Sequence, residues 1–78
     1  MPSNKPYPEA LLSYGDHIRK KRLYLNLLQS DVARIINVTT DTIINWELNR
    51  TNPASSQISK INLFLGYLPN IVKVHSSE

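Results

Sequence analysis

The stretch from Gln29 to Glu47, with the sequence QSDVARIINVTTDTIINWE, constrains the fold most. Apolar residues recur in each half of it at the three-to-four spacing of an amphipathic helix: Val32, Ala33 and Ile36, then Ile43 and Trp46. Between the halves, Asn37 tolerates the left-handed backbone that ends a helix, and Thr39 can cap the next helix. The pattern therefore predicts two short helices joined by a tight turn.

The composition indicates a small globular domain. The chain has 78 residues, of which 41% are hydrophobic, so a compact bundle can form and a disordered chain is excluded. It has no cysteine, hence no disulfide or thiolate metal site to supplement the core. No apolar run is long enough to span a membrane, and residues 1–10 lack the apolar segment of a signal peptide. We therefore expect one cytoplasmic domain.

Another helix is predicted before this stretch, over about residues 13–25. One stripe of it carries Tyr14, Ile18, Arg22 and Leu25. Arg22 is a charge on an otherwise apolar stripe, and an isolated buried charge costs more than a small domain can spare. Glu47 lies one turn after Ile43, on the inner face of the third helix. We therefore predict a partly buried Arg22–Glu47 ion pair between these helices.

A fourth helix is predicted after the loop of residues 48–54, because Pro53 prevents the third helix from continuing. Ser55 or Ser56 is expected to cap the fourth helix, and Gly66 to end it. Its inner face is formed by Ile58, Ile61 and Leu65. The fold class is therefore all-α, a compact bundle of four to five helices.

The chain divides into three segments by composition. Residues 1–12 contain three prolines and no apolar periodicity, so we expect a flexible arm there. Residues 13–67 form the helical domain, and residues 68–78 form a tail. The apolar residues of the tail are Leu68, Ile71, Val72 and Val74. A second interface for dimerisation, a brief strand over residues 71–74 and a disordered end all fit this tail.

Five blocks of the sequence resemble the Cro/repressor-like (XRE-type) helix-turn-helix family of bacterial and phage regulators. The blocks are HIRKKR, LLQSDVA, NVTTDTIINWE, NRTNP and ISKINLFLG, which follow in the order and spacing of the family between about Tyr14 and Tyr67. The resemblance implies a lambda-repressor-like bundle that binds operator DNA, usually as a dimer.

A few positions depart from the family pattern. Leu28 stands where a threonine commonly caps the second helix, so that cap must come from another residue. Asn37 and Asn49 replace glycines, and asparagine is the best non-glycine residue at positive φ. We expect Asn26 to end the first helix in the same conformation. No fifth helix is evident after Gly66, which leaves the dimer surface undefined.

The third helix separates into two faces. We expect Thr39, Ile43 and Trp46 to point inward; the outward set is Thr40, Asp41, Ile44, Asn45 and Leu48. In a helix-turn-helix unit the outward face enters the major groove, with its N-terminal residues at the base edges. The resemblance assigns base contacts to Thr40, Asp41, Ile44 and Asn45. Asparagine can pair with adenine, a carboxylate accepts from cytosine, and an apolar side chain suits the thymine methyl group.

Phosphate contacts are expected around this face. The resemblance assigns one to Gln29 at the start of the second helix, where unpaired backbone N–H groups also favour an anion. Thr39 and Arg50 are further candidates, followed by Lys20 and Lys21. The two lysines belong to the run RKKR, which holds four of the nine basic residues and is explained equally well as a solvated surface. The net charge of +3 permits a polyanionic partner without requiring one.

Several of these residues have a structural interpretation as well. Asp41 in a first turn stabilises the helix through its dipole, and Thr39 can act as an N-cap alone. Trp46 fits the core, with stacking on single-stranded nucleic acid as a minor alternative. Ile44 is also suited to contact with a protein partner.

Two functions remain open from the sequence. The first is sequence-specific binding of double-stranded DNA by a small transcriptional regulator that forms a homodimer. The second is a protein-interaction module, such as the antitoxin of a toxin–antitoxin pair. We expect no enzyme, because no nucleophile–base set or phosphate-binding glycine loop can be found. We also expect no metal, cofactor or small-molecule ligand, since His17 and His75 lack a second metal ligand at a useful spacing.

Overall fold

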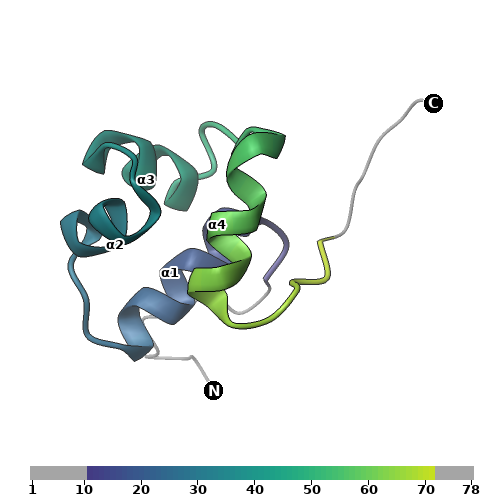
Figure 1. Ribbon diagram of the computed structural model, residues 1–78, viewed down its shortest axis with the longest axis horizontal. Coiled ribbons are helices and arrows are strands. Elements are labelled where there is room, and N and C mark those ends of the chain that lie inside the picture. The colour runs from purple at the N-terminus through teal and green to yellow at the C-terminus, as the bar shows by residue number, and fades with distance from the viewer. Residues whose placement is uncertain (1–10, 72–78) are drawn as a thin grey trace, which may run out of the picture.

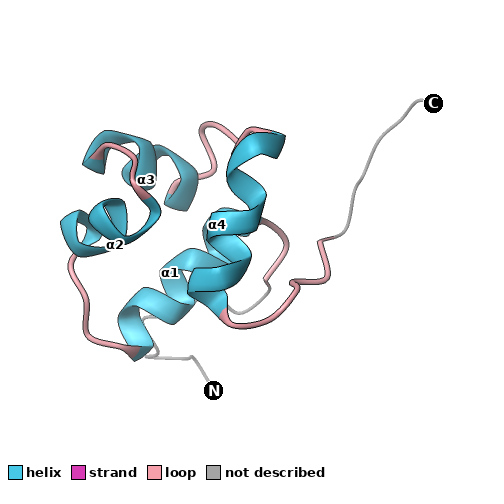
Figure 2. Ribbon diagram, viewed as in Figure 1, coloured by secondary structure: helices cyan, strands magenta, loops and turns pink. Residues whose placement is uncertain are grey.

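The computed structural model describes residues 11–71, which fold into four α-helices (Figure 1). The helices are α1 (Tyr14–Tyr24), α2 (Gln29–Ile36), α3 (Thr40–Glu47) and α4 (Ser55–Leu65). Loops alone connect them in this part of the chain, as Figure 2 shows. The predicted all-α class is therefore confirmed. Most of the predicted arm, and the tail from Val72 on with Val74, lie outside the described residues.

Residues with positive φ close the helices where the sequence predicted them. Asn26, Asn37 and Asn49 have φ values of 58°, 67° and 60°. Asn37 is the C-cap of α2, and Gly66, with φ 83°, is the C-cap of α4. Because asparagine and glycine tolerate the left-handed conformation, the chain reverses sharply at each of these positions.

Polar N-cap side chains begin two of the helices. Ser13 Oγ accepts a hydrogen bond from the Asp16 N–H of α1 at 3.0 Å. Thr39 Oγ1 accepts one from the Thr42 N–H of α3 at 3.2 Å, as an N-cap should. Thr39 itself is exposed, so the expectation that it points inward was wrong. Its hydroxyl is turned toward the open end of α3 instead of the core.

The other two helices begin at residues without a polar side chain. Leu28 is the N-cap of α2, and its backbone N–H donates to Asp31 Oδ2 at 2.8 Å. Ala54 is the N-cap of α4, and its backbone N–H donates to Gln57 Oε1 at 3.1 Å. The expected cap by Ser55 or Ser56 was therefore wrong. The side chain of Gln57, the third residue of α4, accepts this hydrogen bond from Ala54, the residue before the helix. The helix therefore begins at Ser55.

All four helices contribute to one core. Its buried apolar residues are Ile18 of α1, Val32, Ala33 and Ile36 of α2, Ile43 and Trp46 of α3, and Ile61 and Leu65 of α4. Tyr14 and Ile58 pack against this core and are partly buried. Leu25 is exposed, contrary to its expected place on the inner stripe, because α1 ends at Tyr24 and Leu25 is already the C-cap.

The backbones of α1 and α3 approach each other closely at Gly15. A Cβ atom added there would collide with the carbonyl oxygen of Trp46 and lie 2.5 Å from its carbonyl carbon. Only glycine leaves room for the α3 backbone at this point. This contact sets how deeply α3 sits against α1, and with it the position of the outer face of α3.

Candidate nucleic-acid interface

The outer face of α3 is open to solvent, whereas its inner face is fixed in the core. Ile43, Trp46 and Glu47 are buried. The outward residues are exposed at Thr40, Asp41 and Leu48 and half-buried at Ile44 and Asn45. The helix therefore presents hydroxyl, carboxylate, amide and aliphatic groups on one surface, and no basic side chain belongs to α3 itself.

An ion pair between Arg22 and Glu47 fixes the end of α3 against α1, as the sequence predicted. Arg22 Nε donates to Glu47 Oε2 at 2.7 Å and Nη2 donates to Oε1 at 2.9 Å, an arrangement with two parallel hydrogen bonds. The side chains are 12% and 2% exposed. Arg22 Nη1 also donates to the Leu27 carbonyl oxygen at 3.1 Å, so the guanidinium has protein acceptors on three of its donors.

The same carboxylate orients a proposed DNA contact on α2. Gln29 Nε2 donates to Glu47 Oε1 at 3.2 Å. The network therefore joins α1, α2 and α3 around one buried carboxylate. Gln29 is the first residue of α2, and the leucine before it offers no side-chain acceptor, which leaves the first N–H groups of that helix for an external anion.

A second network fixes the turn that follows α3. Asn49 Nδ2 donates to Asp16 Oδ1 at 3.0 Å, and Ser13 Oγ donates to Asn49 Oδ1 at 2.6 Å. The sequence predicted the positive φ of Asn49 but not these contacts, because they depend on residues more than thirty positions away. The turn after the third helix is thus tied to the start of α1.

Arg50 follows this turn and lies beside the outer face of α3. Its backbone N–H donates to the Asn45 carbonyl oxygen at 2.9 Å, and its side-chain Nη1 is 3.5 Å from Asn45 Oδ1. The long side-chain distance describes a weak interaction between exposed groups. Both side chains can therefore turn toward a ligand on this surface.

Lys20 and Lys21 lie at a different place. They line a pocket together with other residues of α1 and with Tyr67, which follows α4, and no residue of α2 or α3 belongs to its lining. The structure thus brings Gln29, Thr39 and Arg50 together around α3 and separates these two lysines from them.

A buried histidine is the feature that sequence reasoning missed. His17 Nδ1 is 2.8 Å from the hydroxyl oxygen of Tyr67, and its Nε2 is buried without a hydrogen bond. Burial lowers the pKa of His17 below 6.5 and raises the pKa of Tyr67 above 10.0. His17 was considered only as a metal ligand, and within residues 11–71 no three His, Asp or Glu side chains form a group that could hold a metal ion. No local pattern around His17 indicated that it is buried, because its partner Tyr67 lies fifty positions away.

One comparison with known proteins agrees with this geometry. A family model described as helix-turn-helix matches residues 18–70, which include α2, α3, α4 and most of α1. Comparison with curated proteins and with solved structures gave no significant match. Among the described helices, none is long and apolar enough to cross a membrane.

Proposed function

Because this chain belongs to the Cro/C1-type (XRE) helix-turn-helix family of DNA-binding transcriptional regulators, we propose that it recognises a specific duplex sequence with α3. The observation that carries this proposal is the division of α3 into a buried inner face and an outer face of mixed polar and aliphatic groups. A helix of this kind fits the major groove, where hydrogen-bonding groups and thymine methyl groups are both exposed.

Base contacts are assigned to four residues of the outer face: Thr40, Asp41, Ile44 and Asn45. Thr40 and Asp41 lie in the first turn of α3, which in this motif approaches the base edges. Asn45 can make a paired contact with adenine, Asp41 can accept from the amino group of cytosine, and Ile44 can contact a thymine methyl group. The two half-buried residues, Ile44 and Asn45, are partly held in place before DNA binds.

Phosphate contacts are assigned to Gln29, Thr39 and Arg50. One N–H of the Gln29 side-chain amide donates to Glu47, so the second N–H is left for a phosphate oxygen. Thr39 and Arg50 are exposed near the two ends of α3. Phosphate contacts near both ends of α3 would set the register of the helix along the groove without reading the base sequence.

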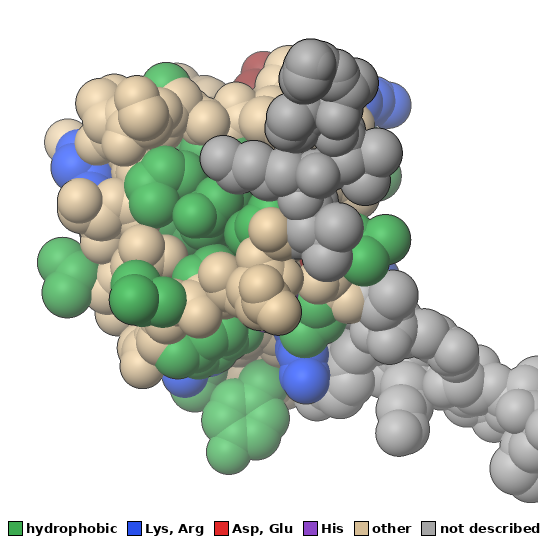
Figure 3. Space-filling model, turned by 90° about the vertical axis from the view of Figure 1, so that its right-hand side faces the viewer, with side chains coloured by type: hydrophobic (Ala, Val, Ile, Leu, Met, Phe, Trp, Pro, Cys, Tyr) green, Lys and Arg blue, Asp and Glu red, His purple; other side chains and the backbone are tan. Residues whose placement is uncertain are grey.

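A homodimer would place two such helices on successive major grooves, about 34 Å apart. The side of the molecule that carries α4, seen in Figure 3, shows hydrophobic side chains gathered across it. Leu63 of α4 and Leu68, which follows that helix, are 83% and 80% exposed. Exposed apolar groups of this extent favour a protein contact, and a second copy of the chain is the partner that a two-fold operator requires.

Selection of bound duplexes from a random pool tests the proposal directly. The enriched duplex and a scrambled control are then titrated at two salt concentrations, since phosphate contacts alone produce salt-sensitive binding to any sequence. A short, preferably palindromic site with a clear affinity gap is expected. Salt-sensitive binding without enrichment would contradict sequence recognition and favour the protein-interaction alternative.

A further inference from the structure

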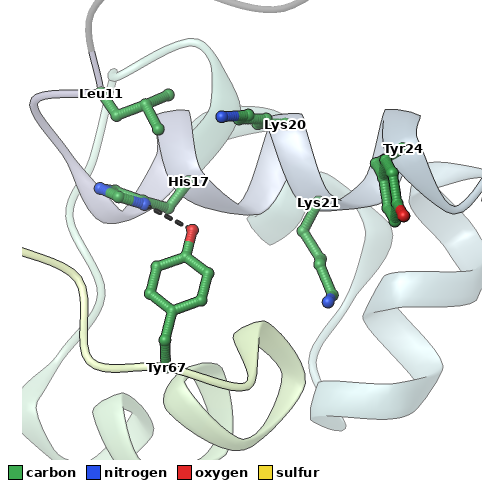
Figure 4. A pocket seen from close by; sticks show the side chains of 6 residues that line it. All are labelled: Leu11, His17, Lys20, Lys21, Tyr24 and Tyr67. Carbon is green, nitrogen blue, oxygen red and sulfur yellow. Dashed lines mark hydrogen bonds between the residues drawn. The ribbon is translucent and has the colours of Figure 1, made fainter.

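A shallow pocket of about 370 Å³ lies on the side of α1 that faces the end of α4. Its lining consists of Leu11, His17, Lys20, Lys21, Tyr24 and Tyr67 (Figure 4). Lys20, Lys21 and Tyr24 follow His17 at helical spacing, so α1 contributes most of one wall. Tyr67, beyond Gly66, stands opposite this wall. The volume is in the range of sites for small molecules.

The charged side chains that line the pocket are all basic. Lys20 and Lys21 bring two ammonium groups, and none of the six lining residues is acidic. In Figure 4 the lysine side chains point in different directions, Lys20 along the helix toward Leu11 and Lys21 away from α1 on the side where Tyr67 lies. An anionic group bound at either edge would therefore meet a cation, and a cation would be repelled.

The lining of the pocket is mainly apolar, and a contact between His17 and Tyr67 fixes part of it. The His17 ring is buried, and its Nδ1 lies 2.8 Å from the Tyr67 hydroxyl oxygen. The two rings meet edge to face, with their centroids 5.6 Å apart and an interplanar angle of 61°. This contact fixes the Tyr67 ring as a wall, so the hollow exists before a ligand binds.

We propose that this pocket binds a small aromatic carboxylate, with the ring against Tyr67 and Leu11 and the carboxylate on Lys20 or Lys21. The apolar area selects an aromatic body, and the two lysines select the negative charge. The ligand would contact both α1 and the residue after α4, so it would stabilise the joint between them. The site is independent of the proposed DNA contacts, because α2 and α3 take no part in its lining.

The experiment is an NMR titration of the full chain with benzoate as the probe and benzamide as its neutral counterpart. Benzoate is expected to give saturable shifts in the amide and side-chain signals of the six lining residues. Benzamide is expected to bind about two- to fivefold more weakly, because it loses one ion pair with a solvent-exposed lysine. The double variant Lys20→Gln, Lys21→Gln should lose that preference. Lys60→Gln is the matched control, because Lys60 is an exposed lysine of α4 outside the pocket lining.

The outcomes separate clearly. Saturable benzoate shifts at the pocket that weaken to the benzamide level in the double lysine variant and are unchanged in the Lys60 variant support the site. Equal binding of benzoate and benzamide, shifts located elsewhere, or no saturation would overturn it. Unchanged thermal melting of the double variant shows that any loss is not caused by unfolding, and none of these readouts depends on DNA binding.

Discussion

The two faces of α3 differ in what holds them and in what they can do. On the inner face, Glu47 is enclosed by donors from α1 and α2, and the Trp46 backbone touches Gly15. On the outer face, the polar groups of Thr40 and Asp41 point to solvent. The inner carboxylate already has its protein partners, whereas the exposed outer groups still have capacity for an external one. Stability is therefore carried by one side of this eight-residue helix, and the proposed recognition of DNA by the opposite side.

The largest effect is expected from Glu47→Ala on the inner face. The substitution leaves the Arg22 guanidinium nearly buried without its carboxylate, and a buried charge deprived of its partner typically destabilises a fold by roughly 3–5 kcal/mol. Chemical denaturation monitored by Trp46 fluorescence measures the change. Arg34→Ala is the control, since the Arg34–Asp31 pair is exposed and its loss should change the free energy of unfolding by about 0–1 kcal/mol. Equal stabilities of the two variants would contradict the inner role of the ion pair.

Gly15→Ala tests the same face by sterics instead of charge. The added methyl group meets backbone atoms of Trp46, which cannot rotate away, so α1 and α3 must separate. Overpacking of this kind typically destabilises by about 1–3 kcal/mol. Gly66→Ala is the comparison, because nothing lies within 4 Å of its Cβ position and only its φ of +83° is unfavourable. A Gly15→Ala protein that melts at the wild-type temperature would show that the close approach is not required.

Asn45→Ala tests the outer face and should leave the melting temperature nearly unchanged. Loss of a base contact is expected to weaken binding to the selected site by roughly 1–3 kcal/mol, with little effect on random DNA. Arg50→Ala, as a phosphate contact, should weaken both kinds of DNA alike and reduce the salt dependence. The measurement is a pair of titrations on specific and scrambled duplexes. If Asn45→Ala lowered the affinity for every sequence equally, α3 would not be the element that reads the bases.

The smallest effect concerns pH and the buried side of α1. Burial lowers the pKa of His17 below 6.5, and Lys20 acts in the same direction, while Asp16 and the Leu11 carbonyl oppose it. The unfolded chain therefore takes up the proton first. Stability from this group is fully present above pH 6.5 and is lost as the pH falls through the lower pKa of the folded state.

Denaturation at about pH 7.5 and about pH 5 measures this effect in the wild type and in His17→Leu. Part of the loss of stability at the lower pH should be absent from the variant. His75→Gln is the control, because it removes the other histidine of the sequence, and it should retain the wild-type dependence. The same pH dependence in His17→Leu and in the wild type would assign the titration to other groups.

The sequence predicted more of α3 and its surroundings than of the joint between α1 and α4. The burial of Ile43 and Trp46 and the Arg22–Glu47 pair were predicted correctly from local patterns and from the rule that a buried charge needs a partner. The positive φ of Asn37 and Asn49 was predicted correctly as well, whereas Thr39 does not point inward. The base and phosphate contacts remain predictions. The His17–Tyr67 contact was not foreseen, because it joins residues fifty positions apart and neither carries a local signal of burial.

The sequence by itself determined most of the helix ends, because caps, turn asparagines and apolar spacing act within a few residues of one another. The caps of α2 and α4 are local as well, since Asp31 and Gln57 each accept from the backbone N–H three residues earlier, although the start of α4 was not predicted correctly. Only the tertiary structure decided that Gly15 must be a glycine and that Lys20 and Lys21 lie at a pocket built without α3. Those features arise where distant helices meet, and their relative placement depends on the packing of the whole core.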